Sequence, residues 1–307
     1  MKTGQNYGEY LEQIGGRGAV FGNSDPSIQG AGSRITYPNR FTYIGIGMLV
    51  QINGWRWESE FDSTLGYVYT GMGKNEDFYW NENSRSQVPG FDTSRWRFRD
   101  SGYSFENTDR FIIHNSKTSV LDHRWQNRLE RDFFVYKNIH LYGILGLSFY
   151  KNYFISYDSS YYAKPNMFGY TANGNSFENK IVELQGGLGF RSKHFSDKLV
   201  FDVSFAPLIG LNRSEDHHVA RNLHSLHSGF GNGFLTRLES KLHVTDNISF
   251  ALRYTAHRFY SIGKWTTSGI PTNYEDLAKR LTSNSAGWNW ITNKESRWEV
   301  YLEYKVK

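Results

Sequence analysis

The chain has 307 residues, 21% of them charged, with a formal net charge of +5 and no cysteine. Its mean hydropathy is −0.60 and no run approaches about 18 uncharged apolar residues, so a transmembrane helix is excluded. The positive charges are spread along the chain, which excludes a basic nucleic-acid-binding tail. Aromatic residues make up 17%, and there are 30 Gly against 6 Pro, which favours strands joined by tight turns.

The first predicted strand is weakly marked. Residues 4–22 are its candidate, and the stretch 22–33, which contains Gly, Ser and Pro, is the expected first outer loop. No apolar segment of a signal peptide precedes this strand. We therefore interpret Met1 as an added start on a mature chain whose signal peptide has been removed.

The next two strands are the clearest in the sequence. Between Ile44 and Ile52, apolar residues alternate with Gly and Gln, which is the period of a strand with one apolar face. Asn53-Gly54 follows, the strongest two-residue signal for a β-hairpin. The following strand carries aromatic and aliphatic residues on one face between Trp55 and Tyr69. Its other face carries Arg56, Glu58, Glu60, Asp62 and Thr64.

The same alternation recurs to the end of the chain, near residues 121–135, 138–157, 182–190, 199–211, 234–244, 248–260 and 298–306. Short turns are expected at 53–54, 137–138, 193–197 and 245–247. Long polar segments are expected at 71–118, 158–178, 212–232 and 263–286. Short and long connections alternate, as periplasmic turns alternate with extracellular loops in outer-membrane barrels. With the weak first strand, the count is ten.

Whether the apolar face of each strand points outward or inward decides between a transmembrane barrel and a soluble one. A soluble barrel would bury its apolar face, whereas here the polar face carries both signs of charge and aromatics gather near strand ends. Apolar outside and polar inside is the transmembrane pattern; the alternative is a β-sandwich with one wet face per sheet. We predict an all-β, antiparallel, up-and-down transmembrane β-barrel of about ten strands with long extracellular loops. Residues 1–307 form its single domain, in the bacterial outer membrane.

The charged inner face has two interpretations. Glu58, Glu60 and Asp62 resemble a spaced set of carboxylates, and a glycosidase needs two such groups flanking a cleft. In a narrow closed lumen opposite Arg124 and Arg128, they fit structural ion pairs better. We favour the structural interpretation.

The predicted loop 212–232 carries the strongest candidate for chemistry. Asp216 and His218 are two residues apart, so they project to the same side of an extended backbone. A carboxylate beside an imidazole orients it and raises its basicity, as a general base that activates water requires. Acidic, His-rich loops are more often simply solvated. His224 and His227 would also allow adventitious metal binding, although no closed ligand spacing predicts a metal site.

At these residues the sequence resembles the omptins, ten-stranded outer-membrane endopeptidases of Gram-negative bacteria. Omptins carry an Asp-x-His pair in the fourth outer loop and an Asp-x-Asp pair in the second, facing each other across a groove. Asp216-His217-His218 matches the first pair and Asn75-Glu76-Asp77 lies at the second; Ser285-Ala286-Gly287 before the last strand is also similar.

The resemblance implies a mechanism and partners. His218, oriented by Asp216, would activate a water held between it and Asp77, while Asn75 positions the water or donates to the oxyanion. Glu215 and Glu76 would contact a peptide or protein substrate at the cell surface. The resemblance also implies outer-membrane lipid, including lipopolysaccharide, as a partner, and no cofactor.

The chain departs from the omptin pattern at several positions. Asn75 stands where the first Asp of the Asp-x-Asp pair is expected, and Ser214 stands where typical omptins have an acidic residue. The wall near Tyr150–Tyr153 does not match the lipopolysaccharide site, and Lys307 is not the common terminal aromatic. These departures fit a distant active member, one with altered specificity, or a barrel that has lost the activity.

Two other functions remain open. Long outer loops suit a non-catalytic barrel, such as an adhesin, a receptor-like surface protein or a narrow channel. The many aromatic residues also suit a secreted all-β protein that binds or cleaves carbohydrate.

Overall fold

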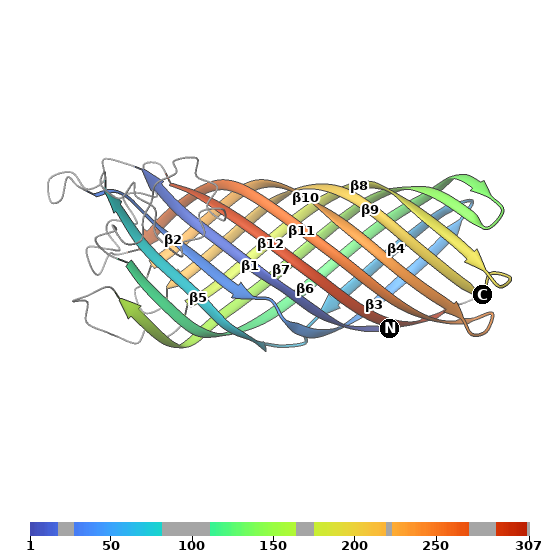
Figure 1. Cartoon of the computed structure of the whole chain (residues 1–307), viewed down its shortest axis with the longest axis horizontal. Helices are drawn as coiled ribbons and strands as arrows, with labels where there is room; N and C mark the ends of the chain where they lie inside the picture. The colour runs from blue at the N-terminus through green and yellow to red at the C-terminus, as the bar shows by residue number, and fades with distance from the viewer. Residues whose placement is uncertain (18–27, 82–110, 164–174, 219–222, 270–286, 306–307) are drawn as a thin grey trace.

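A computed structural model describes residues 1–17, 28–81, 111–163, 175–218, 223–269 and 287–305. In this part of the chain, twelve antiparallel strands form one sheet that closes into a barrel, because the last strand pairs with the first (Figure 1). The strands are β1 (Lys2–Arg17), β2 (Ile28–Pro38), β3 (Phe41–Ile52), β4 (Trp55–Ser63), β5 (Val68–Asn81), β6 (Phe111–Tyr136), β7 (Ile139–Ala163), β8 (Asn175–His194), β9 (Leu199–His218), β10 (Leu223–His243), β11 (Ile248–Gly269) and β12 (Gly287–Tyr304). No helix in the described ranges is long and apolar enough to cross a membrane.

The twelve strands make ten passes through the wall. Strands β2 and β3 both pair with β1, so they are two halves of one interrupted pass. Strands β4 and β5 both pair with β6 and form a second interrupted pass. The predicted antiparallel barrel of about ten strands is therefore confirmed, including the weakly marked first strand.

The two faces of the wall point as predicted. Apolar side chains face outward, for example Ile46 at 65% and Leu188 at 64% exposure. Charged side chains face inward and are buried, for example Arg124 at 1% and Glu183 at 0%. A solvated barrel would reverse this arrangement, and a sandwich would leave sheet edges, so the transmembrane interpretation holds.

The four short turns lie at the predicted positions, at the end of the barrel that also holds both termini (Figure 1). Asn53 and Gly54 have φ values of 49° and 79°, and two successive positive φ values are what a tight type I′ hairpin needs.

The predicted outer loops are wrong in extent, because the strands continue into them. Strand β6 spans 26 residues and β7 spans 25. Of the predicted loop 212–232, only 219–222 lies between β9 and β10, and β2 already begins at Ile28 inside the predicted loop 22–33. Beyond the lipid the outward-facing residues become polar, as at Glu215 and His217. The apolar alternation then disappears although the strand does not.

The lumen is narrow enough that large side chains need glycine opposite them. A Cβ on Gly189 of β8 would overlap the ring of Tyr142, and one on Gly231 of β10 would overlap Phe259. These glycines let the two rings lie flat against the inner wall and fill the lumen.

Candidate functional site

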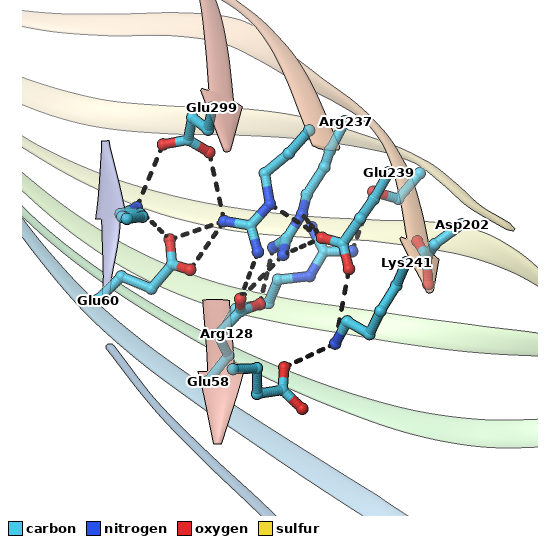
Figure 2. A network of polar contacts seen from close by, with 12 residues as sticks. Glu58, Glu60, Arg128, Asp202, Arg237, Glu239, Lys241 and Glu299 are labelled. Carbon is cyan, nitrogen blue, oxygen red and sulfur yellow. Dashed lines mark hydrogen bonds and ion pairs between the residues drawn. The ribbon is translucent and has the colours of Figure 1, made fainter. Parts of the chain in front are cut away.

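The periplasmic half of the lumen is filled by a network of ion pairs (Figure 2). Arg237 of β10 donates two hydrogen bonds to Glu58 of β4, at 2.7 and 2.8 Å. These strands are five passes apart in a ring of ten, so this pair crosses the full width of the lumen. Arg237 also contacts Glu239 at 2.7 Å. Paired, bidentate geometry of this kind is the strongest that charged side chains make.

A second arginine extends the same network. Arg253 of β11 contacts Glu60 at 2.7 Å, Glu58 at 2.8 Å and Glu239 at 2.9 Å. Lys2 of β1 approaches Glu60 to 2.7 Å and also lies near Asp62 and Glu299. Carboxylates from β4, β10 and β12 are therefore bound to cations from β1, β10 and β11 across the lumen.

Two further clusters flank this network. Arg191 of β8 bridges Glu130 at 2.6 Å and Asp202 at 2.9 Å. Arg124 of β6 contacts Asp122 at 2.7 Å and Glu295 of β12 at 2.9 Å. A void of about 30 Å³ lies beside the central network, which is room for about two or three water molecules.

Toward the outer end, the lumen holds aromatic rings among buried polar side chains such as Glu12, Asp216 and His227. Tyr10 of β1, Tyr37 of β2, Phe154 of β7 and Phe177 of β8 are all at most 2% exposed and pack against one another. Their ring centroids lie 4.8 Å apart for Tyr37–Phe154, 5.1 Å for Tyr10–Phe177 and 5.2 Å for Tyr37–Phe177. We call these four residues, with Ile35, Phe41, Tyr43, Val120 and Ile291, the aromatic cluster.

The residues predicted for catalysis come from two strands, not from loops. Asp216 lies on the inner face of β9 and is fully buried, between Phe177 on β8 and Ser225 on β10. Asn75 lies on β5 and is 9% exposed. Strands β6, β7 and β8 separate β5 from β9, so the two residues lie on different sides of the lumen.

The other predicted site residues are less completely described. The backbones of His218, Glu76 and Asp77 belong to β9 and β5, and their side chains lie outside the described part. Glu215 alternates with Asp216 and is turned outward, 3.1 Å from Arg213 and 3.7 Å from His224. Its role in substrate binding, like the catalytic roles, stays a prediction.

Sequence reasoning did not find two buried His–Glu pairs. His227 of β10 lies 3.0 Å from Glu12 of β1, and His257 of β11 lies 2.8 Å from Glu183 of β8. All four side chains are at most 2% exposed. Each pair joins strands that are not neighbours, so only the closed barrel brings its members together. The sequence signal for these residues was the alternation of each strand, which places them on the face that points into the lumen.

The lipid-facing belt and closed sheet define an outer-membrane β-barrel. The family model described as "Putative porin" matches residues 21–300, and the chain belongs to this family. Family and fold place it in the bacterial outer membrane. No curated protein sequence matches the chain.

One solved structure shows the same fold at low identity, and two others match with lower TM-scores. The outer membrane protease OmpT from Escherichia coli has a TM-score of 0.52 and 12% identity, covering 98% of this chain and 96% of that one. The translocator domain of the autotransporter NalP from Neisseria meningitidis has a TM-score of 0.32 and 11% identity, over 99% and 89%. The toluene transporter TodX from Pseudomonas putida has a TM-score of 0.27 and 7% identity, over 97% and 89%. The likeness to the omptin is one of fold, which hosts several functions.

Proposed function

We propose that this chain is a non-catalytic outer-membrane barrel, receptor-like or a narrow channel, whose lumen is closed along its axis in the state described. The observation that carries the proposal is the Arg237–Glu58 pair, which spans the lumen with both side chains buried. An open aqueous pore would leave such groups hydrated and apart. The aromatic cluster supports the same conclusion from the outer side.

An omptin-like endopeptidase is the second candidate, because Asp216 and Asn75 both lie in the outer part of the barrel. It is less well supported, since Asn75, which would position the water, is only 9% exposed. A group that positions or activates water must come within hydrogen-bond reach of that water. Burial of Asp216 is compatible with this candidate, because Asp216 would only orient His218, which is the base.

Planar-bilayer recording of the refolded barrel tests the axial closure. We expect no stable conductance steps from the wild type, and small steps from a variant that loosens both layers, Arg237→Ala/Arg253→Ala combined with Phe154→Ala/Phe177→Ala. Leu252→Ala, which changes the neighbouring lipid-facing residue, is the matched control for insertion and should stay silent. Ohmic conductance of the wild type would overturn the closed-lumen proposal.

Peptide cleavage is measured separately, with a mixed peptide library in detergent, with and without lipopolysaccharide. We expect no cleavage above the level of the His218→Ala and Asp216→Asn variants. Cleavage that both variants abolish would establish the second candidate instead.

Outer-membrane lipid is the partner we propose for the wall. Lys151 of β7 is the register partner of Lys180 on β8, which is the partner of Arg213 on β9. Their side chains are 50%, 48% and 63% exposed and lie just beyond the apolar residues of these strands, where anionic headgroups would meet them. Lys180→Glu/Arg213→Glu should reduce copurified lipopolysaccharide several-fold; an unchanged amount would refute this assignment.

A further inference from the structure

Two histidines lie side by side on the outer surface of the barrel. His217 of β9 and His224 of β10 are direct register partners in the antiparallel ladder. His217 follows the inward-facing Asp216 and is exposed, and His224 precedes the inward-facing Ser225 and has a side chain that is 43% exposed. Because side chains alternate along a strand, the two imidazoles share the face of the wall that points away from the lumen.

The two histidines belong to the part of the wall that continues past the lipid. Strand β9 ends at His218 and β10 begins at Leu223, at the end of the barrel opposite both termini (Figure 1). Leu211 and Phe230 are outward-facing register partners nearer the membrane on the same two strands, and both are apolar. The histidines stand beyond this apolar belt, where a dissolved ion can reach them.

The spacing of the two rings suits one shared metal ion. Their centroids lie 5.9 Å apart, with the ring planes at 85°. A Zn–N bond of about 2 Å, added to about 1 Å from nitrogen to ring centre, places each centroid about 3 Å from a bound ion. Two rings on one ion can therefore be up to about 6 Å apart. Small side-chain rotations bring one nitrogen of each ring to the same point.

The sheet holds the two imidazoles in place before any ion arrives. Strand β9 is paired with β8 on its other side, and β10 with β11, through the residues that carry the histidines. Directly opposite residues in an antiparallel pair keep their Cβ atoms about 4.5–5.5 Å apart. The second imidazole is thus present at a high effective concentration once the first has bound.

Negative charge lies beside the imidazole pair. Glu215 is on the same outward face, and its Oε2 lies 3.7 Å from Nε2 of His224. A carboxylate next to a metal-binding imidazole orients the ring and raises its basicity. Arg213 contacts Glu215 at 3.1 Å, so this carboxylate is held beside the imidazoles and is not counted as a ligand.

The protein supplies two ligands at this place. Among the described residues, no three His, Asp or Glu side chains already converge on one point. Water would fill the remaining positions of the ion, as in open sites that exchange their metal. The sequence suggested His224 and His227 for adventitious binding, but the structure separates them. Three residues apart on one strand, they face opposite sides, and His227 lies inside the lumen against Glu12.

We propose that His217 and His224 form an outward-facing site for one divalent transition-metal cation of the class of Zn²⁺, Ni²⁺ or Cu²⁺. Imidazole nitrogen suits these ions, whereas Mg²⁺ and Ca²⁺ prefer oxygen ligands. The bound ion links β9 to β10 outside the membrane. This site is on the outer surface, so it stands independently of whether the lumen is closed or the barrel cleaves peptides.

Calorimetric titration with Zn²⁺ tests the site, using refolded barrel in detergent without a histidine tag. We expect one ion per barrel with a dissociation constant in the micromolar range, and no binding of Mg²⁺ under the same conditions. His217→Ala and His224→Ala should each weaken Zn²⁺ binding at least about tenfold, because a single imidazole binds without the chelate effect. Glu215→Gln should weaken it a few-fold. All three side chains are exposed, so these variants should fold.

Two other histidines serve as controls. His194 is exposed and contacts Ser192 and Phe201, and His194→Ala should leave Zn²⁺ binding unchanged. His218→Ala changes the neighbouring residue that the endopeptidase candidate needs, and it should also leave binding unchanged. Loss of binding in His218→Ala but not in His224→Ala would place the ion elsewhere and overturn the assignment.

Electron paramagnetic resonance with Cu²⁺ counts the coordinating imidazoles directly. We expect two imidazole nitrogens in the wild type and one in His217→Ala or His224→Ala. Equal Zn²⁺ affinity in the wild type and in both single variants would mean an adventitious ion only. That result, or the absence of Zn²⁺ binding, would refute the proposed site and leave the proposed function of the barrel untouched.

Discussion

The substitution Arg237→Gln tests whether the ion-pair network is buried, as the closed lumen requires. It removes two hydrogen bonds to Glu58 and the 2.7 Å contact to Glu239. Removing one partner of a buried ion pair costs about 3–5 kcal/mol. Glu58 and Glu239 each keep a contact to Arg253, at 2.8 and 2.9 Å, so we expect a loss near the lower end, about 3 kcal/mol.

A double-mutant cycle isolates the pair that crosses the lumen. Glu58→Gln with Arg237→Gln removes both charges, so the double variant should be more stable than the sum of the two single losses. We expect a coupling energy of about 2 kcal/mol, as for residues in one buried network. Arg213→Gln, whose side chain is 63% exposed, is the control and should change stability by less than about 0.5 kcal/mol.

The assay is reversible urea unfolding in phospholipid vesicles, followed by tryptophan fluorescence. A loss below about 0.5 kcal/mol for Arg237→Gln, together with zero coupling, would mean that water solvates these charges. The periplasmic half of the lumen would then be hydrated, and the closure proposed from the ion-pair network would be refuted.

Three further substitutions have defined outcomes in the same unfolding assay. Gly189→Ala should cost about 1–3 kcal/mol because the new methyl group overlaps the ring of Tyr142; no loss would show that the ring can move away. His257→Leu should cost about 1–3 kcal/mol because it leaves Glu183 buried without its 2.8 Å hydrogen-bond partner, and adding Glu183→Gln should recover part of this loss; absence of recovery would argue that the histidine stabilises by packing alone. Gly54→Ala should cost about 1 kcal/mol because its φ is 79°, and an unchanged midpoint would show that the hairpin adopts another turn type.

The alternation of apolar and polar residues was sufficient to predict the barrel wall, because lipid requires an apolar outer face on every strand. Ile44 to Ile52 and the strand from Trp55 show an apolar outer face and a polar inner face, and the structure has both as predicted. The prediction failed where lipid ends. Glu215 and His217 face outward into water, so β9 continues to His218 without the apolar signal that marks its earlier part.

The partners inside the lumen could not be predicted in the same way. The sequence analysis expected Arg124 and Arg128 opposite these carboxylates, whereas Arg128 lies beside Glu58 in the wall. The structure pairs Glu58 with Arg237 across the lumen instead. Such a choice depends on the diameter and stagger of the closed barrel, which no single strand encodes. The interpretation that these carboxylates form structural ion pairs was therefore right. Which arginine each carboxylate contacts could not be predicted from the sequence.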